Sequence, residues 1–103
     1  MTMKDIVYIS GKISGTSDYM ERFQKAEDLL ISKGYRVINP AKVMCPLDGT
    51  LDYEQMMELD FRLIDWAHTI FMMHGWQQSC GANRELGYAL GTEKDVMYED
   101  DLH

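Results

Sequence analysis

The sequence predicts an α/β fold in which a four-stranded parallel sheet is flanked by helices. One observation, combined with a general rule of chain topology, predicts it. Four short apolar runs alternate along the chain with stretches of helical periodicity, and strands that alternate with helices form parallel sheets through right-handed crossovers. The chain has 103 residues, a length that corresponds to a single domain covering residues 1–103.

The first strand is predicted over residues 6–10 and is followed by a loop rich in Gly, Ser and Thr. A helix is predicted over residues 18–33, where Asp18 and Glu21 have the spacing of a capping box. The apolar positions of this helix recur at helical spacing and are Tyr19, Phe23, Ala26 and Leu30.

The second strand is predicted over residues 35–39, between the helix stop signal Gly34 and Pro40. Residues 41–52 are interpreted as a loop because they contain a Pro and an Asp-Gly turn dipeptide. The second helix is predicted over residues 53–67, with Asp52 as its N-cap.

The third strand is predicted over residues 69–73, and its unbroken apolar run indicates burial on both faces. A loop over residues 75–80 leads into a third helix over residues 81–90, which we expect Gly91 to end. A fourth strand is predicted over residues 95–99.

The expected strand order is 2-1-3-4, in the three-layer arrangement of flavodoxin-like and Rossmann-like domains. In such sheets the winding reverses between strands 1 and 3, and ligands bind at the carboxyl ends of the strands at that point. The loops at this point are residues 11–17 and 75–80. We therefore expect the ligand site between them.

The composition excludes several classes of function. The formal net charge of −7 argues against binding to duplex nucleic acid, which needs a basic face, but a small anion could still bind at a helix N-terminus. Cys45 and Cys80 do not have disulfide or zinc-ligand spacing, so we expect no metal and no cofactor. No segment has the pattern of a signal peptide or membrane span, which predicts a cytoplasmic protein.

Glu85 is the strongest candidate for a working residue. It shares a helix face with Ala82 and Ala89, and its place near the helix start predicts a low pKa. The alternative is a solvated glutamate that only complements the helix dipole. Gly87, inside the same helix, would be explained by close packing against the sheet or against a partner.

Asp60 interrupts the apolar face of the second helix, so its carboxylate must find donors or change its pKa. It lies about 10 Å along the helix axis and reaches the site only if the helix leans across it; otherwise it lies at the rim of the face. Tyr8, near the end of the first strand, is either a core residue or a lid over the ligand.

The first loop contains Gly11 and Gly15, which would let the backbone approach a ligand, while its hydroxyls and amides could donate to phosphate oxygens. The alternative is an ordinary strand-to-helix connection.

Three motifs occur in order over nearly the whole chain: residues 7–15, residues 60–73, and residues 79–89 with Glu85-Leu86-Gly87 at their centre. Together they resemble the nucleoside 2-deoxyribosyltransferase-like superfamily, and in particular a small uncharacterised branch from bacteria and phages, related to the 2′-deoxynucleoside 5′-phosphate N-hydrolases.

The resemblance implies cleavage of an N-glycosidic bond through a glycosyl ester on Glu85. It implies that Asp60 lies near the base and that Tyr8 positions the nucleophile or the sugar. The substrate- and phosphate-binding residues that we predict from the matched motifs are Ser10, Gly11, Lys12, Ser14, Gly15, Ser79 and Asn83.

We therefore expect transfer or hydrolysis of a (deoxy)ribosyl group of a nucleoside or nucleotide. Two alternatives are a non-catalytic module that senses a nucleotide and a purely structural partner in a larger assembly. A homodimer or higher homo-oligomer is expected, because a small sheet with an exposed edge invites a partner.

Overall fold

A computed structural model describes residues 5–13 and 15–102 of the chain. Its four strands form one parallel sheet in the order β2-β1-β3-β4, which confirms the predicted fold class and strand order. The strands are β1 (Ile6–Ser10), β2 (Arg36–Ile38), β3 (Thr69–Met72) and β4 (Asp95–Tyr98). In the register of the sheet, Tyr8 of β1 lies between Ile38 and Ile70.

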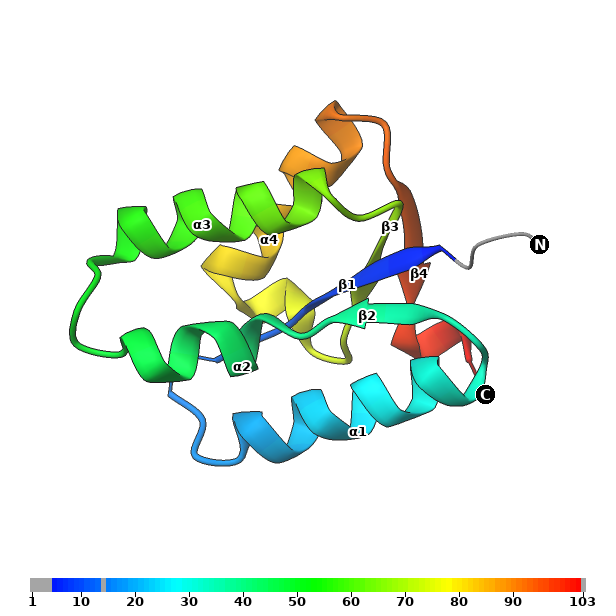
Figure 1. The fold of residues 1–103 in the computed structure, drawn as a ribbon, viewed down its shortest axis with the longest axis horizontal. Helices are drawn as coiled ribbons and strands as arrows, with labels where there is room; N and C mark the ends of the chain where they lie inside the picture. Colours follow the sequence, from blue (N-terminus) through cyan, green and yellow to red (C-terminus); the bar gives the residue numbers. More distant parts are fainter. Residues whose placement is uncertain (1–4, 14, 103) are drawn as a thin grey trace.

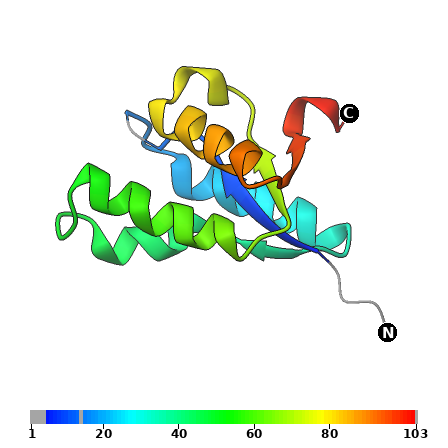
Figure 2. The same cartoon turned by 90° about the horizontal axis from the view of Figure 1, so that it is seen from above.

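Helices cover both faces of the sheet (Figure 1). The α-helices are α1 (Tyr19–Ser32), α2 (Pro40–Met44), α3 (Tyr53–Asp65) and α4 (Cys80–Gly91). Three short 3-10 helices are η1 (Cys45–Leu47), η2 (Trp76–Gln78) and η3 (Glu99–Asp101). Helix α1 packs on one face, whereas α3 and α4 lie side by side on the other (Figure 2).

The alternation of side chains along β1 divides the core between these faces. Val7 and Ile9 pack with α1, and Tyr8 packs with α3 and α4. All four residues of β3 are buried, which confirms the prediction from its unbroken apolar run.

The prediction of a loop over residues 41–52 was wrong in its first part, because α2 and η1 occupy residues 40–47. The Asn39 side chain accepts a hydrogen bond from the Ala41 amide at 3.0 Å and caps α2. Pro40 ends β2 and also occupies the first turn of α2, where its fixed φ suits a helix. The chain therefore passes directly from strand to helix.

Two predicted features of helix ends, the cap of α1 and the end of α4, also differ from the structure. The Asp18 side chain makes no capping hydrogen bond in α1, because its carboxylate accepts from Arg22 Nε at 3.1 Å. Helix α4 continues through Gly91, and the left-handed residue after it is Glu93, with a φ of 64°. Gly34, with a φ of 92°, does follow α1 as predicted.

Gly87 is not explained by close packing against the sheet. A Cβ atom added at Gly87 would meet nothing within 4 Å among the described residues. Its side of α4 is exposed, so the structure gives no reason for a glycine there.

The two aspartates that precede α1 and α3 provide a matched test of capping. Asp52 accepts from the Gln55 amide at 2.8 Å, and the Gln55 side chain accepts from the Asp52 amide in return. We expect Asp52→Ala to lower the free energy of unfolding by about 1 kcal/mol. Asp18→Ala, which removes an exposed ion pair but no cap, should cost about 0.5 kcal/mol or less. Urea unfolding measures both, and equal losses would contradict the assignment.

Candidate functional site

Helix α4 and strand β1 meet in a buried polar contact centred on Glu85. The Tyr8 hydroxyl donates to Glu85 Oε2 at 3.0 Å, and the Ser10 hydroxyl donates to Oε1 at 2.6 Å. Tyr8 and Ser10 are 0% exposed, and Glu85 is 6% exposed. The two donors are two residues apart on β1, so they point to the same face of the sheet, and each takes one oxygen of the carboxyl group.

The sequence of α4 places Glu85 against the sheet. The Ser79 hydroxyl accepts from the Ala82 amide at 3.1 Å and caps the helix. Ala82, Glu85 and Ala89 then form the buried face of α4, as predicted from their spacing. The small side chains of the two alanines allow α4 to approach β1 closely enough for these hydrogen bonds.

Asp60 of α3 is a second buried carboxylate at the same site. It is 9% exposed, and its Oδ1 atom has no hydrogen-bond partner. Tyr53, Met57 and Asp60 line one cavity together with Glu85, so α3 lies along the cavity rather than pointing its end at it. This orientation brings Asp60 to the site despite its distance from the helix start.

The two carboxyl groups shift one another's ionisation. Burial, followed by the interaction with Asp60, holds the pKa of Glu85 well above its ordinary value, although the Ser10 and Tyr8 hydroxyls oppose this. Burial also raises the pKa of Asp60, and its interactions with Glu85 and Tyr8 partly offset that rise. Because two adjacent buried carboxyls resist ionising together, we expect the pair to hold one proton at neutral pH.

The prediction of a low pKa for Glu85 was therefore wrong. Helix α4 begins at Cys80, which places Glu85 beyond the first turn, where the dipole acts most strongly. Desolvation inside the core outweighs what remains of that effect. The same desolvation, with the nearby Glu85 and Asp60 carboxyls, raises the pKa of the Tyr8 phenol, which therefore remains a hydrogen-bond donor.

The cavity has a volume of about 420 Å³ and is lined by residues of the segments that follow β1, β2 and β3. Its walls are largely apolar and aromatic, with a few polar groups. The residues that line it are Gly11, Lys12, Ile13, Tyr19, Met44, Cys45, Asp48, Tyr53, Met56, Met57, Asp60, Gln78, Ser79, Cys80, Gly81, Ala82 and Glu85.

The structure brings together several of the predicted site residues. Gly11, Lys12, Asp60, Ser79 and Glu85 line the cavity. Tyr8 and Ser10 do not line the cavity, but their hydroxyls donate hydrogen bonds to the Glu85 carboxyl.

Two predicted residues within the described part of the chain are not brought to the cavity. Gly15, with a φ of 78°, and Asn83 do not line it, and Ser14 lies outside the described residues. The Asn83 amide donates to the carbonyls of Gln77 and Ser79 at 3.1 and 2.8 Å. The Asn83 side chain therefore holds the loop before α4 in place by hydrogen bonds to the backbone carbonyls of that loop.

Gly11 has a structural role in addition to its place at the cavity. A Cβ atom there would come within 2.7 Å of the Met73 sulfur, a distance that requires something to move. A side chain at this position would therefore displace Met73, so close packing favours a glycine where the end of β1 passes the end of β3, with or without a ligand.

Sequence reasoning missed the wall formed by residues 44–57. We selected only the two loops where the winding of the sheet reverses. Because β2 neighbours β1, the segment after β2 reaches the same edge and contributes Met44, Cys45 and Asp48. The adjacency of β2 in the predicted order was the signal that could have found this wall.

We expect the crowding of the two carboxyls to reduce stability as the pH rises. A carboxyl with a raised pKa in the folded state binds more protons there than in the unfolded chain, so stability falls between the unfolded and folded pKa values. Asp60→Asn should therefore have a free energy of unfolding that exceeds the wild-type value by at least about 1 kcal/mol at about pH 8, and by less at about pH 5.

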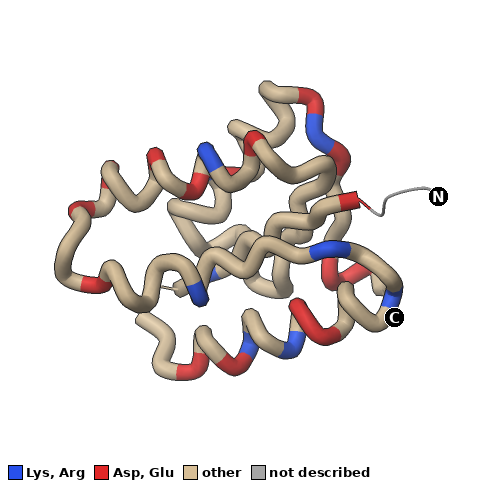
Figure 3. Tube along the Cα trace, in the orientation of Figure 1, with Lys and Arg blue, Asp and Glu red and all other residues tan. Residues whose placement is uncertain are grey.

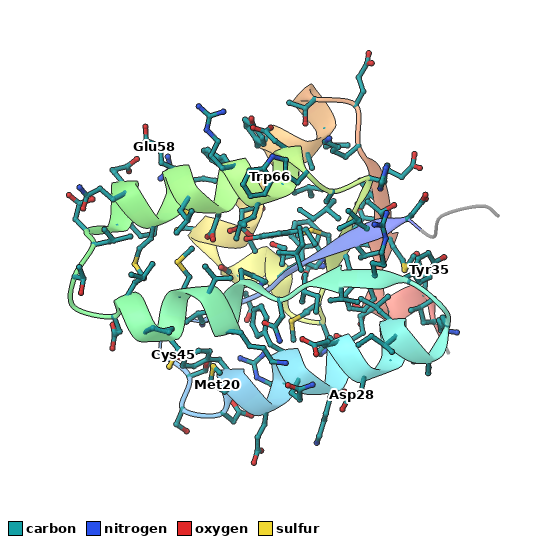
Figure 4. The ribbon with its side chains drawn as sticks, viewed as in Figure 1. Met20, Asp28, Tyr35, Cys45, Glu58 and Trp66 are labelled. Atoms are coloured by element: carbon teal, nitrogen blue, oxygen red, sulfur yellow. The ribbon has the colours of Figure 1, made fainter. Side chains whose placement is uncertain are left out.

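Glu58→Gln is the matched control, since Glu58 points away from the sheet on the exposed side of α3 (Figure 4). Urea unfolding at both pH values measures the difference. If Asp60→Asn and Glu58→Gln changed the free energy of unfolding equally at both pH values, the destabilising interaction between Asp60 and Glu85 would be contradicted.

The described residues lack two other features. No group of three or more His, Cys, Asp or Glu side chains there could hold a metal ion. None of the helices within these residues has the length and apolar character needed to cross a membrane.

Comparison with known proteins gives a family but no function. No curated protein matches the chain. A family model described as a domain of unknown function, DUF4406, matches residues 5–98, which include every strand of the sheet, the Tyr8–Ser10–Glu85 contact and Asp60. The chain therefore belongs to the DUF4406 family.

Proposed function

We propose that this protein cleaves the N-glycosidic bond of a nucleoside or nucleotide, with Glu85 as the nucleophile. The observation that carries the proposal is a buried carboxyl oriented by Tyr8 and Ser10 at the edge of a largely apolar cavity, beside a second carboxyl, Asp60. A nucleophile held rigidly by hydrogen bonds from a central strand meets the geometric requirement for covalent catalysis. The resemblance to the nucleoside 2-deoxyribosyltransferase-like superfamily supports the same chemistry.

In the first step a Glu85 oxygen forms a bond to the anomeric carbon of the sugar. The bond from that carbon to the base nitrogen breaks, and its electron pair leaves with the base. A carboxylate nucleophile of this kind gives a glycosyl ester and, after a second displacement at the same carbon, overall retention of configuration.

The proton of the carboxyl pair has a role in this step. With one proton for two carboxyls, an ionised Glu85 leaves the proton on Asp60, which can pass it to the departing base. Asp60 Oδ1 is the buried acceptor without a partner, so it can also accept a hydrogen bond from a donor on the ligand.

In the second step water or another base attacks the ester at the anomeric carbon and releases Glu85. The attacking water or base gives up a proton to the Asp60 carboxylate, and the carboxyl pair again holds one proton. Water as the acceptor gives hydrolysis, and a second base gives transfer of the sugar.

The cavity suits the remainder of such a substrate. Pockets of 300–1,000 Å³ with mostly apolar linings and a few placed polar groups are usual for small ligands. Tyr19 and Tyr53 in the wall offer aromatic surfaces for a base.

A non-catalytic nucleotide-binding module is the second candidate. The observation that favours it is the raised pKa of Glu85, since a protonated carboxyl is a poor nucleophile. In that case the ligand would bind and be released unchanged. Mass spectrometry of the quenched reaction separates the two candidates, because only the enzyme forms a glycosyl ester on Glu85.

Release of free base is the primary test. We expect the wild type to release base from members of a panel of nucleosides, deoxynucleoside monophosphates and NAD, measured by chromatography. Glu85→Gln should reduce the rate at least about a thousandfold, and Tyr8→Phe, which removes one hydroxyl from Glu85, about tenfold. Glu58→Gln should match the wild type. Base release that survives Glu85→Gln would exclude Glu85 as the nucleophile.

The dependence of kcat/KM on pH tests the shared proton. The rate should fall toward acid as the pair gains a second proton and Glu85 is neutralised. It should also fall toward alkali as Asp60 loses the proton that the base needs. Burial raises both pKa values, so the alkaline limb should lie well above the ordinary carboxyl range. Asp60→Asn should be slower and lack that limb, and a wild-type rate that stays constant from about pH 5 to about pH 10 would contradict the mechanism.

A further inference from the structure

The cavity has an unusual charge balance at the end formed by the first loop, where a 5′-phosphate was expected. Arg22 is the arginine nearest in sequence to that loop, but its guanidinium is already engaged. Its Nη2 donates to the Lys12 carbonyl at 2.8 Å and to the Thr16 hydroxyl at 3.1 Å, while its Nε contacts Asp18 at 3.1 Å. Arg22 therefore shapes the loop from its own helix and does not line the cavity.

The N-terminus of α1 beside this loop carries a carboxylate of its own. Asp18 directly precedes the helix, so its negative charge occupies the end of the dipole that would attract an anion. Asp48 lines the cavity with Tyr19, the first residue of α1. Burial, then the Cys45 thiol and the Asp48 carboxylate, raise the pKa of Tyr19, so the charge of Asp48 acts at this end.

Charges around the whole cavity have the same bias. Lys12 is the one basic residue among the described residues that line it, against the three acidic residues Asp48, Asp60 and Glu85. The Lys and Arg positions are spread over separate elements of the chain (Figure 3). Even with one proton on the carboxyl pair, a phosphate dianion would enter a site without excess positive charge.

The Ser79 and Asn83 side chains at the start of α4 add no positive charge to the cavity. The Asn83 amide is engaged by backbone carbonyls. The Ser79 hydroxyl accepts from the Ala82 amide and keeps its own proton to donate to a ligand, but it is a neutral donor.

We propose that Asp48 is a specificity-determining residue that makes this cavity select uncharged nucleosides over nucleoside 5′-monophosphates. The inference rests on the proposed function only for the position of the sugar, with its anomeric carbon at Glu85 and its 5′ end toward Lys12 and Asp48. A 5′-hydroxyl can donate to the Asp48 carboxylate, whereas a phosphate in its place adds like charge.

The test compares each of the four common 2′-deoxynucleosides with its own 5′-monophosphate. Base release gives kcat/KM, and isothermal titration gives the affinity of the same compounds for Glu85→Gln, which should not consume them. We expect the nucleoside to exceed its monophosphate at least about tenfold in either quantity, because the dianion would enter a cavity whose carboxyls outnumber its one basic residue.

Asp48→Lys tests the residue itself, with the ratio of nucleoside to monophosphate as the readout. The substitution should shrink that ratio at least about fivefold, because it replaces a repulsive charge by an attractive one. Asp95→Lys makes the same change in net charge at the exposed amino-terminal end of β4, the opposite edge of the sheet. It should leave the ratio within about twofold, and thermal unfolding of both variants verifies their fold.

The outcomes separate this inference from the proposed function. Nucleosides that bind more tightly than monophosphates but release no base would support the selectivity and refute the catalysis. Base release with monophosphates equal to or better than nucleosides would overturn the selectivity and leave the catalysis. A ratio unchanged by Asp48→Lys would overturn the role of Asp48, and failure of both ligand classes to bind would overturn the inference as a whole.

Discussion

The contact between Glu85 and β1 joins parts of the chain that are more than 70 residues apart, and the geometry of the site depends on it. A carboxyl group buried in a core costs free energy unless hydrogen bonds satisfy its oxygens. Tyr8 and Ser10 supply one donor to each oxygen, so α4 is fixed in position along the central strand. The face of α4 that makes this contact also sets where the cavity opens, because Ala82 and Glu85 form part of its wall.

Asp60 is not satisfied in the same way. Its Oδ1 atom is buried without a partner, and its charge opposes ionisation of Glu85. An apolar residue there would fit the rest of the inner face of α3 and would remove both penalties. A buried carboxyl that costs free energy and lines a cavity is most simply explained by a ligand that uses it, since unsatisfied groups concentrate at functional sites.

The sequence predicted the strand order, the three longer helices and the elements on which Tyr8, Asp60 and Glu85 lie, because apolar periodicity and parallel topology determine these. It did not predict α2, since the Pro that ends β2 also begins a helix once Asn39 caps it. It also did not predict the direction of the Glu85 pKa shift. That direction depends on how deeply the side chain is buried and on a carboxyl from another helix, and neither is a local property of the sequence.

Local motifs were least informative where one side chain could serve two roles. Ser79 and Asn83 have the residue types that bind phosphate, yet they cap α4 and hold its preceding loop. Arg22 could reach an anion but instead organises the first loop. Because Arg22 and Asn83 donate to partners within the protein, the charged side chains that face the cavity are Lys12 and the three carboxyls. The hydrogen bonds that give the loops their shape thus also decide which donors face the cavity.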